Sequence, residues 1–160
     1  MTMSANLFCT IENETHTRFP TQKIEELIEE AARRVRRDDG KRRKMLVLPF
    51  FVTLYIIGPD RSRALNKQLR GKDEPADVLS LEYPSPQRLG EIFVCPAIVR
   101  KHARAEKRNF EDELAHVVVH GVFHVFGVHH EKSTKVEKLL WQKENAVLKK
   151  LGYKQAHQEK

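Results

Sequence analysis

Hydrophobic and polar positions along the chain follow two periods, and the stretches of each period predict the secondary structure. Near the N-terminus, Leu7, Cys9 and Ile11 alternate with other residues, as on one face of a strand. The later run FVTLYII is β-branched and aromatic, which indicates a buried strand. Two further short runs are separated by a proline-containing break. The strands expected in this way are residues 5–12, 51–57, 77–82 and 91–95.

Apolar residues at helical spacing predict five helices. The first stripe runs from Ile24 to Val35 with apolar residues three and four positions apart. Pro96 suits a first helical turn, Asn109 suits an N-cap and Gly127 suits a C-cap. The helices expected from these signals are residues 21–37, 60–69, 96–107, 110–127 and 134–152.

The order of these elements, βαβαββααα, is typical of an α+β domain. The length of 160 residues fits one domain, and an apolar content of 40% excludes a disordered chain. We expect a single domain over residues 1–152, built as a mixed sheet of about four strands packed with about five helices. A polar tail over residues 153–160 is expected to follow it.

The cysteines and the apolar runs exclude several classes of protein. Cys9 and Cys95 lie in unrelated segments without a CxxC motif, so both are expected to be small buried hydrophobes. The run from Met45 to Gly58 contains Pro49 and is too short to cross a bilayer. The N-terminal residues lack the pattern of a secretory signal. We therefore expect a cytoplasmic protein without a membrane partner.

A net charge of +7 and a pI of about 9.5 favour an anionic partner, of which nucleic acid is the commonest. Part of the charge is local, because basic residues crowd positions 33–44. This run suits a phosphate-binding patch or, more commonly, a solvated helix end and loop.

The segment HVVVHGVFHVFGVHH, residues 116–130, holds five of the eight histidines. Histidine is costly to bury unpaired, so this density favours a metal site over ordinary packing. His120 and His124 are four residues apart and share one helix face, about 6 Å apart along the axis. His116 and His124 are about 12 Å apart along the axis and cannot bind one ion together.

A third ligand is expected beyond the helix, where Gly127 permits a turn and either His129 or His130 follows. Three neutral imidazoles and a water form the open, catalytic kind of zinc site. Zinc proteases place a general-base Glu directly after their first His, but this chain has Gly121 there. Glu131 lies nearby, although its spacing does not require that role. Peptide cleavage of the usual kind is therefore not favoured.

Residues 120–130, HGVFHVFGVHH, resemble the signature of the YbeY family, His-Gly-x-x-His followed two residues later by Gly-x-x-His. The third histidine of that signature falls on His130, and His129 stands where the family often has Asp. Upstream blocks match in order, with Ala76 in place of the usual Thr and Leu81 in place of the usual Phe. These blocks are Leu65-Asn66, residues 70–81 (RGKDEPADVLSL) and Gly90-Glu91-Ile92.

The resemblance covers roughly residues 50–150 and implies a mixed-sheet endoribonuclease with one zinc ion on His120, His124 and His130. It places the functional arginine of the family on Arg70. The implied substrate is ribosomal RNA, in maturation of the 3′ end of small-subunit RNA and in ribosome quality control. The implied partner is the small ribosomal subunit.

Several alternatives stay open at this point. The chain suits a non-catalytic RNA-binding assembly factor with a structural zinc, or a metalloprotease-like hydrolase that Gly121 disfavours. His116 suits a hydrogen bond behind the metal, an RNA contact or, as favoured here, a partly buried histidine with satisfied partners. Asp77 suits a ligand-orienting role or a turn cap. Trp141 and Phe123 lie at helical spacing with other apolar residues, which favours core packing over base stacking.

Overall fold

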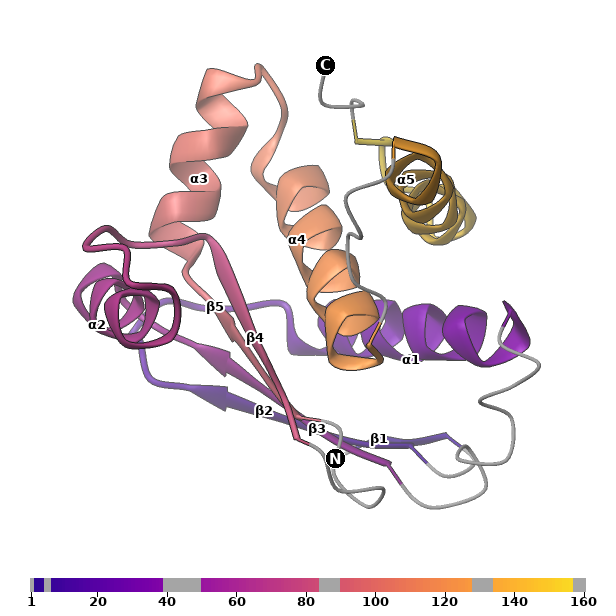
Figure 1. The fold of residues 1–160 in the computed structure, drawn as a ribbon, viewed down its shortest axis with the longest axis horizontal. Coiled ribbons are helices and arrows are strands. Elements are labelled where there is room, and N and C mark those ends of the chain that lie inside the picture. Colours follow the sequence, from indigo (N-terminus) through magenta and orange to yellow (C-terminus); the bar gives the residue numbers. More distant parts are fainter. Residues whose placement is uncertain (1, 5–6, 39–49, 84–89, 128–133, 157–160) are drawn as a thin grey trace.

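The four strands that the sequence predicts are present and form one mixed sheet (Figure 1). The computed structural model describes residues 2–4, 7–38, 50–83, 90–127 and 134–156. A short additional strand, β1, pairs antiparallel with β2 at one edge. β2, β3 and β5 run parallel, and β4 closes the other edge antiparallel to β5. In the order β1-β2-β3-β5-β4, the strands are Thr2–Ser4, Leu7–Asn13, Phe50–Ile56, Gly90–Val94 and Val78–Glu82.

The five predicted helices are also confirmed, with ends that differ from the expected ones by one to two residues. The N-cap prediction holds in detail, because the Asn109 side chain accepts a hydrogen bond of 2.8 Å from the Asp112 amide. Gly127 has φ of +74° just beyond the last helical turn, as expected of a C-terminal glycine. The helices are α1 Thr21–Asp38, α2 Pro59–Arg70, α3 Pro96–Ala105, α4 Phe110–Val125 and α5 Thr134–Lys150.

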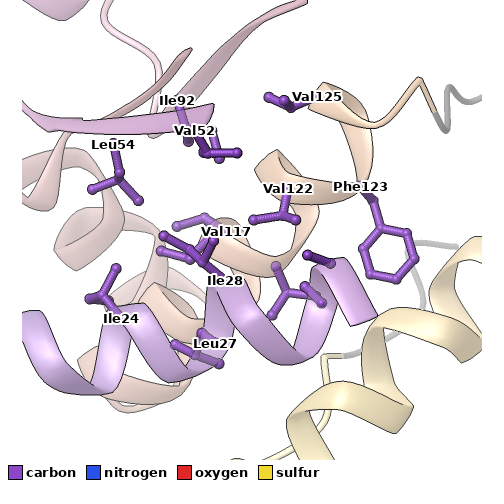
Figure 2. Packing of buried hydrophobic residues seen from close by; sticks show 14 of the residues in the cluster. Ile24, Leu27, Ile28, Val52, Leu54, Ile92, Val117, Val122, Phe123 and Val125 are labelled. Carbon is purple, nitrogen blue, oxygen red and sulfur yellow. The ribbon is translucent and has the colours of Figure 1, made fainter. Parts of the chain in front are cut away.

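Helices cover the two faces of the sheet unequally. Alternate side chains of β3, such as Val52 and Leu54, point at α1 and α4 and form the main core with α5 (Figure 2). The opposite face carries a smaller cluster in which Leu79 and Phe93 pack with Leu65 of α2. α4 is therefore the central helix of the main core, and α2 lies across the sheet from it.

Both cysteines behave as the sequence predicts. Cys9 and Cys95 are free and fully buried in the sheet region. Burial, with a smaller contribution from Glu25, raises the pKa of the Cys9 thiol from 9.0 to about 12. A thiol of this kind is unreactive and acts as a hydrophobic side chain. Within the described ranges, no helix is long and apolar enough to cross a bilayer.

The segment after α5 docks on the start of α4. The Lys154 amide donates to Asp112 Oδ1 at 2.9 Å, and the Ala156 amide donates to Asn145 Oδ1 at 2.8 Å. Arg108 donates from a guanidinium nitrogen to the Gln155 carbonyl at 3.0 Å. Residues 153–156 thus belong to the packed structure. Of the basic run at positions 33–44, residues 39–44 lie outside the described residues, and Arg33 pairs with Glu30 at 2.6 Å.

Candidate metal centre

The two histidines that the helix spacing pairs are brought together on α4. The Nε2 atoms of His120 and His124 lie 2.8 Å apart, and their ring centroids are 4.3 Å apart. Both side chains lie near the C-terminal end of the helix, one turn apart, as the spacing predicts. Each ring therefore presents its Nε2 atom to the same point.

A carboxylate from α5 lies behind this pair. Glu144 Oε1 is 2.7 Å from Nδ1 of His120, and only 4% of the Glu144 side chain is exposed. A carboxylate accepts hydrogen bonds, so Nδ1 is the protonated nitrogen of His120 and Nε2 carries the lone pair. Neutral imidazole nitrogens that converge in this way are the donor type that Zn²⁺ prefers, so these side chains fit the implied metal.

The third predicted ligand, His130, is not among the residues that the structure describes. His129, His130 and Glu131 lie outside the described residues. Within the described ranges, no group of three or more His, Cys, Asp or Glu side chains forms a metal-ligand set. The described part of the chain therefore contains two of the three predicted ligands, and His130 as the third ligand stays a prediction.

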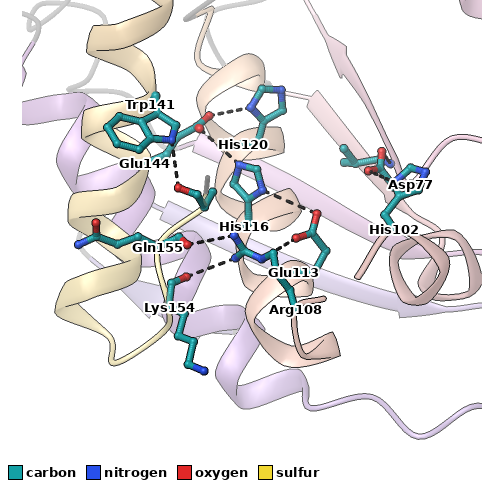
Figure 3. Close-up of polar contacts among 12 residues, drawn as sticks. Asp77, His102, Arg108, Glu113, His116, His120, Trp141, Glu144, Lys154 and Gln155 are labelled. Carbon is teal, nitrogen blue, oxygen red and sulfur yellow. Dashed lines mark hydrogen bonds and ion pairs between the residues drawn. The ribbon is translucent and has the colours of Figure 1, made fainter. Parts of the chain in front are cut away.

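A line of alternating charges continues from Glu144 along α4 (Figure 3). His116 Nε2 lies 3.7 Å from Glu144 Oε2, and His116 Nδ1 lies 3.9 Å from Glu113 Oε1. Glu113 pairs in turn with Arg108 Nε at 3.0 Å. His116 is thus a partly buried histidine held between two carboxylates, which is the favoured sequence interpretation.

These neighbours shift the acid–base behaviour of the buried groups. Burial opposes the protonated form of His116, but Glu113 and Glu144 outweigh it and raise the pKa from 6.5 to about 9. Burial likewise opposes the Glu144 carboxylate, but His116 and His120 lower its pKa to about 2. The pKa of Glu113 is lowered chiefly by His116. His116 is therefore cationic at neutral pH, and both carboxylates are ionised.

In the metal-free protein, the His116 ring is expected to be half-protonated only at a pH of about 9. Because its pKa is raised by folding, its contribution to the free energy of unfolding is complete below the ordinary value of 6.5 and declines as the pH rises through about 9. NMR titration of the ring, assigned with His116→Gln, measures this directly. A midpoint near the ordinary value would show that the two carboxylates do not hold the proton.

Packing explains why the position after His120 carries no side chain. A Cβ atom on Gly121 would lie 2.9 Å from Ile92 Cγ2 and 3.3 Å from Val78 Cγ2. α4 therefore approaches β4 and β5 through this glycine, and a glutamate here would meet the sheet. The absent protease-type base is a consequence of how the helix packs.

The other singled-out residues are placed as follows. Arg70 is the last residue of α2 and is exposed, on the helix that covers the other face of the sheet. The C-terminal end of α4, which carries His120 and His124, lies apart from α2 in Figure 1. Asp77 accepts from the Val78 amide at 2.7 Å and lies 3.0 Å from Nδ1 of His102, so it binds the first amide of β4 and pairs with a histidine. Phe123 is 1% exposed in the core.

Glu144 is the site residue that sequence reasoning missed. It lies on the apolar stripe of α5, at the i+4 position from the buried Leu140 and the i−4 position from the buried Leu148. A carboxylate on the buried face of a helix requires a buried partner. A glutamate on the apolar stripe of a helix was therefore the signal in the sequence that could have identified this residue. The histidine-rich helix was the candidate source of its partner.

Paired imidazoles one helical turn apart, backed by a carboxylate, are found in metal sites of proteins. The sequence matches the family model described as "Endoribonuclease YbeY" over residues 10–152. The chain therefore belongs to the YbeY family of endoribonucleases.

Individual relatives agree with this assignment. An endoribonuclease YbeY of Thermotoga maritima is 37% identical over 100 residues, which span 62% of this chain and 67% of the relative. One of Methylibium petroleiphilum is 36% identical over 112 residues, which span 69% of this chain and 74% of the relative. A solution structure of a Thermotoga maritima protein superposes with a TM-score of 0.60 and 30% identity, covering 90% of this chain and 89% of the other. The sequence comparisons thus identify the family, and the chain shares the fold of that solved structure.

Proposed function

We propose that this protein is a zinc-dependent endoribonuclease of the cytoplasm that cleaves single-stranded ribosomal RNA. Its proposed role is maturation of the 3′ end of small-subunit RNA and quality control of ribosomes, on the small ribosomal subunit. The observation that carries the metal-dependent chemistry is the convergence of His120 and His124, with Nε2 atoms 2.8 Å apart. The family membership and the net charge of +7 support RNA as the substrate.

One zinc ion would be held by His120, His124 and His130. When bound, Zn²⁺ supplies a Lewis acid that makes water more acidic and stabilises negative charge on oxygen. The imidazoles would bind the ion in their neutral form, and Glu144 would keep His120 in place through its contact with Nδ1. Because Gly121 brings no carboxylate to the site, the protein supplies no base from the position that zinc proteases use.

Arg70 is proposed to bind a phosphate of the RNA. Its guanidinium lies at the exposed end of α2, where it is accessible to a polyanion. Arginine binds phosphate through two parallel N–H···O bonds, which lysine cannot reproduce. Since α2 and the C-terminal end of α4 lie apart in Figure 1, the RNA would extend from one to the other. This arrangement suits an extended single strand.

The direct test measures bound metal and cleavage on the same preparations, with RNA and casein as parallel substrates and a chelator added to half of each. RNA cleavage that the chelator abolishes, with casein intact, supports the proposal. Casein cleavage would instead indicate a metalloprotease-like hydrolase. Bound zinc without any cleavage would favour the RNA-binding assembly factor.

Arg70→Ala is expected to retain the metal and to lower kcat/KM for RNA by about 10- to 100-fold, because a charge-assisted contact contributes about 1.5–3 kcal/mol. Arg63→Ala is the matched control on the same helix, since Arg63 is engaged by Asp73 at 2.9 Å. Steady-state cleavage of a labelled single-stranded RNA measures both variants. Equal losses in the two would assign the effect to general charge on α2.

A further inference from the structure

The contact between Glu144 and His120 joins two helices at the proposed metal site. Oε1 of Glu144 lies 2.7 Å from Nδ1 of His120, and the carboxylate side chain is 4% exposed. Figure 3 shows the carboxylate between the rings of His116 and His120, with one interaction to each. The second oxygen lies 3.7 Å from His116 Nε2. Both oxygens of a buried side chain are thus directed at α4.

This geometry determines which nitrogen of His120 carries the lone pair that a metal ion would bind. A neutral imidazole has one N–H and one lone pair, and the partner of the N–H sets the tautomer. With Nδ1 donating to Glu144, the lone pair lies on Nε2. That atom is the one that faces Nε2 of His124 at 2.8 Å. The opposite tautomer would turn the lone pair of Nδ1 toward Glu144 Oε1 and place the hydrogen on Nε2, the atom that would bind the ion.

We propose that Glu144 is a positioning residue for the metal site, which fixes His120 as the Nδ1–H tautomer and so presents Nε2 to the ion. This inference rests on the proposed function for the identity of the ion, but its geometry stands on the described residues alone. α5 is thereby part of the metal site, although none of its residues is proposed as a ligand.

A second feature supports a dedicated role over ordinary packing. The Glu144 side chain interrupts the apolar stripe of α5, where its neighbours Leu140 and Leu148 are 2% and 0% exposed. Burying a carboxylate among such residues is costly unless it is paired and hydrogen-bonded. An apolar residue would pack this position without that cost, so the contact with the histidines is what the carboxylate provides.

The first experiment uses the metal-free wild-type protein and does not depend on any variant. Two-bond ¹H–¹⁵N correlation spectra report which ring nitrogen carries the proton. Wild type is expected to show a single Nδ1–H tautomer for His120. An Nε2–H tautomer, or an equal mixture, would overturn the proposal.

The second experiment compares metal affinity in Glu144→Gln, Glu144→Asp and the control Glu137→Gln, an exposed glutamate on the same helix. Competition of Zn²⁺ with a chromophoric chelator measures each affinity. Removing an outer carboxylate of this kind weakens metal binding by about 10- to 100-fold. We expect that loss in Glu144→Gln, whose amide can also turn an N–H₂ toward the ring and so mix the tautomers. Glu144→Asp is expected to keep the tautomer and part of the affinity.

The outcomes separate this inference from the proposed function. Weaker zinc binding and mixed tautomers in Glu144→Gln, with Glu137→Gln unchanged, support the positioning role even if no preparation cleaves RNA. Wild-type affinity and a single tautomer in Glu144→Gln would overturn the role, even if the protein proves to be a zinc-dependent ribonuclease. A variant that is merely less stable, with wild-type affinity and tautomer, would show a structural role and also overturn the proposal.

Discussion

Replacing His124 with alanine is expected to release the bound metal and to lower RNA cleavage by about 10³-fold or more. The variant removes one of the two imidazole nitrogens that converge within 2.8 Å on α4. A metal ion contributes several kcal/mol to stabilisation of the developing charge, and about 4 kcal/mol corresponds to that factor. Elemental analysis and cleavage of a labelled single-stranded RNA, both on the same preparation, measure the two effects.

His16→Ala is the control for this variant, since His16 is an exposed histidine in the segment between β2 and α1. It is expected to retain wild-type metal content and cleavage. Loss of metal in His124→Ala with cleavage retained would show that the activity does not use this site. Retention of both would remove His124 from the ligand set.

Gly90→Ala is expected to destabilise the fold by about 3–5 kcal/mol, which is among the largest effects of a single substitution. Gly90 begins β5 with φ of +143°, a conformation that side chains with a Cβ rarely adopt. A Cβ atom there would lie 1.7 Å from the backbone oxygen of Leu81 on the neighbouring strand. Urea unfolding followed by circular dichroism measures the change in the free energy of unfolding.

Gly58→Ala serves as the control, because a Cβ atom on Gly58 would meet no heavy atom within 4 Å. Its φ of −81° is compatible with alanine, so a change of about 1 kcal/mol or less is expected. If Gly90→Ala unfolds at the same urea concentration as Gly58→Ala, the close contact between β4 and β5 is relieved without cost.

Most of the fold could be predicted from the sequence, because its periods are long and clear. Alternation on β2 and the β-branched run of β3 predict their strands, and the caps at Pro96 and Asn109 place their helices within two residues. β1 was not predicted, since three residues are too few to show alternation. Its pairing with β2 is a tertiary contact that no local pattern encodes.

In the candidate site, too, the contacts within one element could be predicted and the contacts between elements could not. The pairing of His120 with His124 follows from helix geometry alone, because both residues lie on one helix. The contact with Glu144 spans 24 residues and depends on how α5 packs against α4, which periodicity does not specify. The tight packing at Gly121 is likewise visible only once the sheet lies beneath the helix.

The segment around Leu65 and Arg70, which matches the family pattern, contains residues whose structural role could not be predicted from the sequence. Ser62 Oγ donates to the Ala76 carbonyl at 2.6 Å, and the Asn66 amide donates to the Glu74 carbonyl at 2.8 Å. These buried side chains of α2 hold the segment that leads into β4. Part of the family pattern therefore stabilises the segment before β4. Only Arg70 within the pattern is proposed to contact RNA.

The docking of residues 153–156 on the start of α4 has a mechanical consequence for the other end of that helix. α4 and α5 run antiparallel, because His120 meets Glu144 while Asp112 meets Lys154. Two separate contacts join the helices, one between His120 and Glu144 and one between Asp112 and Lys154, beyond the last turn of α5. Sliding α5 along α4 by one turn, about 5.4 Å, would break both contacts at once. The alignment of the imidazoles is therefore also maintained by contacts about 12 Å away along α4.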